Sequence, residues 1–362
     1  MPAPKPGKPV KPVRTIRLRR SDLTGPGIRR LRSGRGFRYL DADGQRISAE
    51  ELARIKDLVI PPAWKEVWIC PWPNGHIQAV GFDAAGRRQY LYHPRWREKR
   101  DKEKHDHVLD FAAALPDARE IVIARLGERG LTKERVLSAC FRLLDLGFFR
   151  VGGDRYAEDN GTYGLATLQR EHVSFAKGEL TFDYPAKGGF ERIQAIADPQ
   201  VVKVIRSLRA RPVEDKDGAD ALFAYKQGGQ WHRVHSSDIN NYLKELTGLD
   251  VSAKDFRTWN ATVLAAVGLA VSPVPRSSAN SRKRAIARVV KEVSQYLGNT
   301  PAVCRASYID PRVIERYQRG ETIEDALELL GQTEDGALAT QGAIEEAVLT
   351  LLRPELAHAK AS

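Results

Sequence analysis

Apolar and polar residues alternate over short distances in the first hundred residues of the chain. The segments "FRYLDADGQRIS" and "WICPWPNGHIQAVGFDAAGRRQYLYHP" contain short apolar runs separated by Asp-Gly, Asn-Gly and Ala-Gly pairs. Short runs broken in this way are typical of strands joined by tight turns. The pattern predicts a small β-rich N-terminal domain over residues 21–107.

The spacing of apolar residues becomes helical after about residue 108. Val136, Leu137, Cys140, Leu143 and Leu144 recur on one helical face, with Gly147 placed to end that helix. The same spacing predicts further helices over residues 237–247, 254–270 and 282–297, the last ended by Gly298.

One β interruption is expected among these helices. In "ELTFDYPAKGGFERI" the apolar positions alternate, and the chain then turns through "AKGG" and returns. Residues 108–320 are therefore predicted to form a mainly α-helical domain with a β-hairpin. The fold class predicted for the whole chain is α+β, a β-rich domain followed by this helical one.

The two ends of the chain differ in composition from its middle. Residues 1–20 are rich in Pro, Lys and Arg without periodicity, which predicts a flexible basic arm. Residues 321–362 contain nine acidic and two basic residues, which predicts an acidic helical tail. This tail competes with a polyanion for the basic body or docks a partner, and the sequence leaves both alternatives open.

Charge indicates the partner. The chain of 362 residues carries a net charge of +12, and removing the tail's share of about −7 leaves the body near +19. So basic a body suggests a polyanion, of which nucleic acid is the commonest. There is no apolar run long enough for a membrane span and no secretory signal, so a cytoplasmic protein is expected. The three cysteines, Cys70, Cys140 and Cys304, fit neither a disulfide framework nor a zinc site.

Five residues are candidates for chemistry, although each also has an ordinary explanation. Arg150 precedes Gly152 and Gly153 in "FFRVGGDRY", where glycines let the backbone approach a ligand closely. Its planar fork suits a phosphate, but also suits a surface ion pair. Lys187 lies at the hairpin turn "PAKGG", where a lysine is usually solvated.

The other three candidates lie in the last third of the chain. Arg257, in "KDFRTW", is expected on a partly buried helix and needs a compensating anion, either Asp255 or a ligand phosphate. Asn299 follows a helix end, as capping residues do, and Tyr308 in "RASYIDP" has the surroundings of a core aromatic.

Taken together, the motifs resemble a known family. "FFRVGGDRY", "KDFRTW" and "LGNTP" followed by "ASY" occur in the order and spacing found in type IB DNA topoisomerases of the poxvirus-like and bacterial branch. The resemblance spans about residues 20–320. It implies the catalytic fold that these enzymes share with tyrosine recombinases, and relaxation of supercoiled duplex DNA through a 3′-phosphotyrosyl intermediate.

The resemblance also implies roles for individual residues. Arg150, Lys187, Arg257 and Tyr308 match catalytic positions of the family, and Asn299 stands where many members have histidine. Tyr308 is then the nucleophile, the arginines bind the phosphate, and Lys187 protonates the leaving oxygen. No cofactor, ATP or metal is required, because two arginines supply the positive charge.

The same family implies how DNA is held. A monomer clamps the duplex and works at the nucleoid, with Gln89, Tyr90 and Tyr92 of "GRRQYLYHPRW" near base edges in the major groove. Arg155 and Tyr156 are expected to contact the DNA backbone.

Two alternatives remain at this stage. A site-specific tyrosine recombinase shares the arginines, lysine and tyrosine, but has a histidine where this chain has Lys254 and a helical rather than β-rich N-terminal domain. A non-catalytic architectural DNA-binding protein needs only the charge, and such a protein is indifferent to Tyr308→Phe.

Overall fold

A computed structural model describes residues 17–176, 179–212, 220–272, 278–333 and 338–353. The chain divides into two compact units, Met1–Lys104 and His105–Ser362. Residues 1–16 of the predicted basic arm lie outside the described residues, and Arg19 already pairs with Gly75. The predicted domain boundaries at residues 20, 107 and 320 stay predictions. Among the described residues there is no helix with the length and apolar character that crossing a membrane demands.

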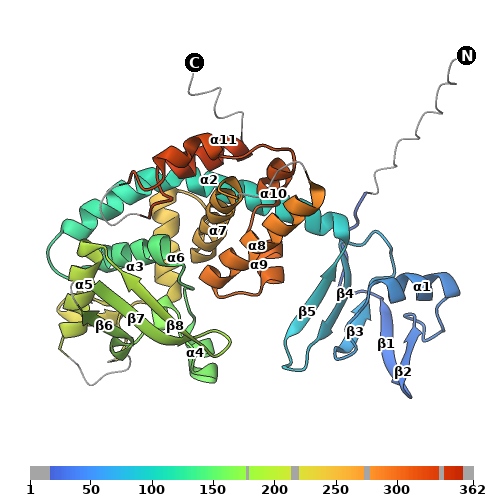
Figure 1. Ribbon diagram of the computed structural model, residues 1–362. Coiled ribbons are helices and arrows are strands. Elements are labelled where there is room, and N and C mark those ends of the chain that lie inside the picture. The colour runs from blue at the N-terminus through green and yellow to red at the C-terminus, as the bar shows by residue number, and fades with distance from the viewer. Residues whose placement is uncertain (1–16, 177–178, 213–219, 273–277, 334–337, 354–362) are drawn as a thin grey trace, which may run out of the picture. The chain divides into compact units, whose positions relative to one another are not determined.

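The first unit is built on a five-stranded antiparallel sheet (Figure 1). The strand order is β2 (Gly36–Leu40), β1 (Ile28–Ser33), β3 (Lys65–Ile69), β4 (Ile77–Phe82) and β5 (Arg88–Tyr92). One face of the sheet packs on α1 (Ala49–Asp57) through a small core that includes Ile28, Ile55 and Ile69. Helix α1 was not predicted. The residues at its start, "SAEE", nevertheless match the capping-box motif, and Ser48 and Glu51 form that capping box in the structure.

The second unit is mainly helical, as predicted. Its helices are α2 (Pro94–Gly127, from His105 on), α3 (Lys133–Gly147), α4 (Asp154–Asn160), α5 (Pro199–Ala210), α6 (Ser236–Thr247), α7 (Ala253–Ala270), α8 (Ala279–Leu297), α9 (Pro301–Ser307), α10 (Pro311–Gln318) and α11 (Ala343–Leu352), with 3₁₀ turns η1 (Leu165–Thr167), η2 (Arg170–His172) and η3 (Glu324–Leu329). Helices α3 and α7 are almost entirely buried, because α3 packs on α5, α6 and α7, and α7 also packs on α8, α10 and α11 (Figure 1).

The strands of the second unit form two small sheets. One has the order β6 (Val173–Ala176), β7 (Glu179–Ala186) and β8 (Phe190–Ile196), and it contains the predicted hairpin. The other is a hairpin of β9 (Ala224–Gln227) and β10 (Gln230–Arg233) that was not predicted, so the expectation of a single β interruption is wrong. Gly228 and Gly229, both at positive φ, make its two-residue turn.

The end of α3 also differs from the prediction. Gly147 is still helical, and Phe148 takes the left-handed cap position with φ of 53°. A Cβ at Gly147 would lie 2.3 Å from the ring of Phe149, so glycine is needed here for close packing rather than for its φ. The left-handed turn at Phe148 sends the chain directly into the segment that contains Arg150.

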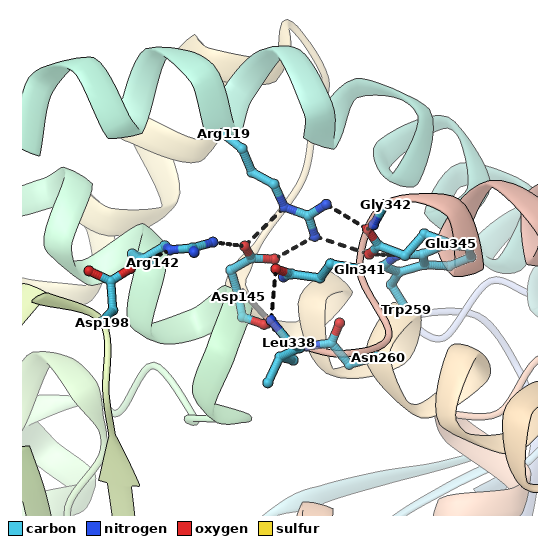
Figure 2. Close-up of polar contacts among 10 residues, drawn as sticks. All are labelled: Arg119, Arg142, Asp145, Asp198, Trp259, Asn260, Leu338, Gln341, Gly342 and Glu345. Atoms are coloured by element: carbon cyan, nitrogen blue, oxygen red, sulfur yellow. Dashed lines mark hydrogen bonds and ion pairs between the residues drawn. The ribbon is translucent and has the colours of Figure 1, made fainter. Parts of the chain in front are cut away.

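A buried ionic network joins the tail to the core of the second unit (Figure 2). Arg119 of α2 donates to both carboxylate oxygens of Asp145 on α3, at 2.8 and 3.0 Å, and to both of Glu345 on α11, at 2.5 and 3.0 Å. The indole Nε1 of Trp259 on α7 donates to Glu345 Oε1 at 2.7 Å. The predicted acidic tail therefore supplies a buried carboxylate that contacts two helices of the core.

Candidate active site

Tyr308 follows α9 directly, where the helix ends. Thr300 caps the start of α9, and the Tyr308 backbone N–H donates to the Cys304 carbonyl at 3.0 Å. Thr262 of α7 holds the next turn, because its Oγ1 contacts the Tyr308 carbonyl at 3.3 Å and accepts from the Asp310 N–H at 3.1 Å. The ring is half-buried against the core, so Tyr308 has both the packing of a core aromatic and an accessible side.

Arg257 is buried beside Tyr308. Its guanidinium carbon lies 5.3 Å from the centre of the Tyr308 ring. Nη1 donates to the Phe148 carbonyl at 2.5 Å, and Nη2 to the Leu297 carbonyl and to Asn299 Oδ1 at 2.7 and 2.8 Å. Asp255, the other anion considered, caps the start of α7 instead.

The electrostatics of Arg257 favour an added anion. Burial, and after it the charge of Arg150, lower the pKa of Arg257 to about 10, while Tyr308 acts in the opposite direction. The side chain is therefore still charged at neutral pH, but at a free-energy cost. Its Nε is buried and has no hydrogen-bond partner among the described residues. An anion nearby would relieve the electrostatic cost by stabilising the charged form.

Arg150 approaches the same point from the segment after α3. Its Nη2 donates to the Gly298 carbonyl at 2.8 Å and to Asn299 Oδ1 at 2.9 Å. The segment is held against a neighbouring one, since the Leu165 N–H donates to the Arg150 carbonyl at 2.8 Å. A Cβ at Gly164 would lie 2.5 Å from the Gly152 nitrogen. Gly152 thus allows backbone to approach backbone, whereas a Cβ at Gly153 would meet nothing within 4 Å.

Asn299 joins the two arginines. Its Oδ1 accepts from Nη2 of both Arg150 and Arg257, which are donors only. Because the carbonyl end of the amide faces two cations, the Nδ2 end faces the other way. Gly298 is the left-handed cap of α8, and Asn299 after it holds the two guanidinium groups together while its Nδ2 donor lies on the other side of the amide.

A third arginine belongs to this group and was not predicted. Arg192 of β8 donates from Nη2 to the Tyr296 carbonyl at 3.1 Å. Arg192, Arg257 and Arg150 thus bind three successive carbonyls at the end of α8, those of Tyr296, Leu297 and Gly298. The only sequence signal was an arginine at an inward-facing position of the hairpin, which is weak by itself.

The end of α8 explains how three cations share one place. The last carbonyls of a helix lack partners within it and bear partial negative charge, so they attract cations. No ion pair joins any of the three arginines to a carboxylate in the part of the chain that the structure describes. Dipoles compensate the charges only in part, and the cluster keeps a positive potential suited to one phosphate.

Lys187 lies in the turn between β7 and β8. Two hydrogen bonds close to it in sequence connect this hairpin to the rest of the second unit. The Tyr163 N–H donates to the Pro185 carbonyl at 2.8 Å, and Arg192 ties β8 to α8. The hairpin that contains Lys187 is thus connected to the arginine cluster.

The predicted DNA-contacting residues of the first unit, all on strand β5, lie on opposite faces of that strand. Tyr90 and Tyr92 lie on one face, 36% and 39% exposed, with ring centres 6.0 Å apart. Arg88 shares that face, with its guanidinium 5.5 Å from the Tyr90 ring. Gln89 faces the opposite side and donates to Asp83 at 3.0 Å. Period-two alternation of the sequence already implies this division.

The two predicted DNA-backbone contacts belong to the second unit. Arg155 and Tyr156 are in α4, and their side chains lie outside the described part of the structure. No group of His, Cys, Asp and Glu suited to a metal ion occurs among the described residues.

Cys70, Cys140 and Cys304 are buried free thiols. Burial raises the pKa of Cys304 to about 11, so its thiol stays protonated near Arg257 at neutral pH.

Comparison with known proteins agrees with this geometry. Residues 93–333 match the family model for the catalytic core of eukaryotic DNA topoisomerase I, and residues 36–83 match that for the N-terminal domain of bacterial DNA topoisomerase IB. The chain is 31% identical over 300 residues to DNA topoisomerase 1B of Acanthamoeba polyphaga mimivirus, covering 81% of this chain and 88% of the relative. It is 22% identical over 243 residues to DNA topoisomerase 1B of vaccinia virus, covering 65% and 71%.

These matches confirm the resemblance and the α+β fold class, and they decide against the recombinase and the architectural protein as families for this chain. Both units contribute, since the bacterial N-terminal model covers much of the first sheet and the core model covers the segments with Arg150, Arg257, Asn299 and Tyr308. The chain belongs to the type IB DNA topoisomerase family.

Proposed function

We propose that this protein relaxes supercoiled duplex DNA by cutting and rejoining one strand through Tyr308. The observation that supports it best is the arrangement at the end of α8, where Arg150, Arg257 and Asn299 surround the space beside Tyr308. A scissile phosphate there receives guanidinium and amide donors on its non-bridging oxygens.

The chemistry is a transesterification. The Tyr308 oxygen forms a bond to phosphorus as the bond from phosphorus to the 5′ oxygen breaks, and the tyrosine proton leaves to solvent or a nearby base. A free tyrosine, with a pKa of about 10, is a weak nucleophile at neutral pH. The charge on Arg257 and Arg150 favours the developing phenolate and the pentacoordinate phosphorane. Donors of this kind contribute roughly 3–4 kcal/mol each in other enzymes.

Lys187 is assigned the role of general acid. Its ammonium gives a proton to the departing 5′ oxygen, which then leaves as a hydroxyl group. General acids contribute about 10²–10⁴-fold in rate. Rotation of the freed end relaxes the DNA, and attack of the 5′ hydroxyl on the phosphotyrosine restores the strand. One phosphodiester replaces another, so no ATP is needed, and the two arginines supply the positive charge that a divalent ion would otherwise provide.

One chain is proposed to enclose the duplex on the nucleoid, with Tyr90 and Tyr92 near base edges. A net charge of +12 supports binding to phosphates along the duplex, with an affinity that falls steeply with salt. Light scattering of the complex with a short duplex checks the stoichiometry, and a mass that requires two chains per duplex contradicts the monomeric clamp.

The function is tested by plasmid relaxation in EDTA without ATP. The parent is expected to relax the plasmid, and Tyr308→Phe to bind it with parental affinity without relaxing it. A covalent adduct trapped by denaturation should form with the parent alone. Relaxation by Tyr308→Phe, or none by a folded and DNA-binding parent, would show that Tyr308 is not the nucleophile of such an enzyme.

A further inference from the structure

Arg192 is the member of the arginine cluster that comes from the β7–β8 hairpin. It lies on β8 opposite Tyr184, inside the hairpin whose turn contains Lys187. Its Nη2 donates to the Tyr296 carbonyl at 3.1 Å and to the Gly147 carbonyl at 3.4 Å, and its Nε to Gln194 at 3.3 Å. The side chain thus connects the hairpin to two helices.

Those two helices are the ones that precede the phosphate-binding residues. Gly147 is the last residue of α3, and Arg150 follows it closely. Tyr296 is in the last turn of α8, and Asn299 follows that helix. One guanidinium group therefore fixes, relative to the hairpin, the starting points of both segments.

Arg192 is costly as a purely structural residue. Burial lowers its pKa, Tyr184 opposes that shift, and the charge of Arg150 lowers the pKa further. An apolar side chain at this position of a hairpin avoids both the desolvation and the repulsion. Its Nη2, however, donates to carbonyls of two helices, those of Gly147 and Tyr296, which an apolar side chain cannot do.

Near its turn, the outward face of the hairpin adds little packing. The last strand pair before the turn is Ala186 with Phe190. Phe190 and Ile193 are 74% and 69% exposed, so β8 gains little from packing near its tip. On its inward face Tyr184 and Ala186 are buried and the Tyr163 N–H donates to the Pro185 carbonyl, and Arg192 adds to these contacts its hydrogen bonds to the ends of α3 and α8.

We propose that Arg192 is a positioning residue that anchors the Lys187 hairpin to the ends of α3 and α8, and so sets the distance from the Lys187 ammonium to the leaving 5′ oxygen. This inference rests on the proposed role of Lys187 as general acid. Arg192 itself does not touch the DNA.

The test separates proton donation from phosphate binding. With a 5′-bridging sulfur at the scissile phosphate, the bond that breaks joins phosphorus to sulfur, and a thiolate leaves without needing a proton because thiols are far more acidic than alcohols. Loss of the general acid should therefore matter for the oxygen substrate and matter little for the sulfur substrate.

Arg192→Met removes the donors and the charge at similar length. We expect single-turnover adduct formation on the oxygen substrate to slow by roughly tenfold to a hundredfold, as misplacement by about 1 Å does elsewhere. On the sulfur substrate the rate should return to near that of the parent. Affinity for the duplex, measured at the same salt, should stay unchanged.

Three variants serve as controls. Lys187→Ala should slow cleavage on oxygen by about 10²–10⁴-fold and be rescued by sulfur. Arg257→Lys, which acts on the phosphate, should be slow on both substrates. Glu191→Gln, an exposed neighbour on β8, should match the parent on both. If Arg192→Met folds poorly, Arg192→Lys keeps the charge and loses the fork, and the ratio of its two rates gives the same answer.

The outcomes distinguish the positioning role of Arg192 from the general-acid role of Lys187. An Arg192 variant that is equally slow on both substrates, while Lys187→Ala is rescued, overturns the positioning role and assigns Arg192 to the phosphate site. A parental rate on oxygen overturns it as well. Failure of sulfur to rescue Lys187→Ala overturns the general-acid assignment instead, whatever the Arg192 variants do.

Discussion

Asn299 shows how one side chain gains a role from its neighbours. In isolation it is a residue after a helix end, and many such residues only cap. Two arginines that can only donate turn its Oδ1 toward them. The remaining Nδ2 end is a hydrogen-bond donor that, unlike an imidazole ring, does not exchange a proton with a ligand near neutral pH.

Asn299→Asp tests that hydrogen bond. The carboxylate keeps the shape and accepts from both arginines, but it removes the Nδ2 donor and repels a phosphate. We expect single-turnover cleavage to fall by roughly 10²–10³-fold, with a melting temperature equal to or above that of the parent. Asn299→Ala should also be slow, and Asn299→His should keep much of the activity. Cleavage by Asn299→Asp at the parental rate would exclude a donor role.

His172 makes stability depend on pH. Burial lowers its pKa, with Glu171 and Asp183 opposing the shift, and its Nδ1 accepts the Gln169 N–H at 3.0 Å. The folded state therefore disfavours the protonated ring. Its contribution to the unfolding free energy is complete above the unfolded pKa near 6.5, and is lost as the pH falls through that value.

The expected result is a melting temperature that drops between about pH 7.5 and about pH 5. His172→Asn keeps an acceptor near the Gln169 N–H and does not titrate, so its melting temperature should drop less over the same range. Equal drops in parent and variant would assign the pH dependence to other groups.

Among the elements, the two loops that meet at Gly152 and Gly164 are the most tightly constrained near the site. Their backbones approach so closely that a Cβ at Gly164 would lie 2.5 Å from the Gly152 nitrogen and 2.8 Å from the Arg150 carbonyl oxygen. Backbone atoms cannot rotate aside as a flexible side chain does, so the segment with Arg150 has to move.

Gly164→Ala is therefore expected to reduce cleavage at least tenfold, the cost of displacing a catalytic group by a fraction of 1 Å to about 1 Å. Gly153→Ala provides the matched control, since its Cβ meets nothing within 4 Å and its φ of −149° suits any residue. Rapid-quench adduct formation compares the two. Similar rates for both variants would mean that the contact does not position Arg150.

Most elements were predictable because their signals are local. Helices α6, α7 and α8 follow apolar spacing and stop residues, and the β7–β8 hairpin follows alternation and a Gly-Gly turn. Helix α1 and the β9–β10 hairpin had comparable signals, a capping box and a second Gly-Gly pair, which were overlooked. The residue at which α3 ends could not be predicted from the sequence, because the left-handed conformation of Phe148 depends on tertiary packing.

At the scale of the whole molecule, the described part of the acidic tail packs on the core of the second unit through α11. Glu345 is 7% exposed and satisfies donors from α2 and α7. Arg353 adds a bond to Asp110 of α2 at 2.7 Å. Trp259, which Glu345 contacts, is two residues from Arg257, so the tail supports the helix that provides Arg257.

Removing this carboxylate should destabilise the second unit. Glu345→Ala leaves the Arg119 charge and the Trp259 N–H short of a partner, which typically lowers the unfolding free energy by about 3–5 kcal/mol. Glu328→Gln removes an equal charge from the exposed part of the tail and should leave stability unchanged. Chemical denaturation measures both. Salt-dependent DNA affinity should be the same in both variants, and tighter binding by each would favour a tail that competes with DNA.

By itself, the sequence determined the family, the fold class and the identity of the candidate residues, because motif order, apolar spacing and net charge are properties of residue type and separation. Only the tertiary structure decided how those residues act together. The three arginines come from segments far apart in the chain and meet at carbonyls of α8 that a sequence does not display. Burial, hydrogen-bond partners and the sharing of Asn299 follow from that meeting, since they depend on distance in space.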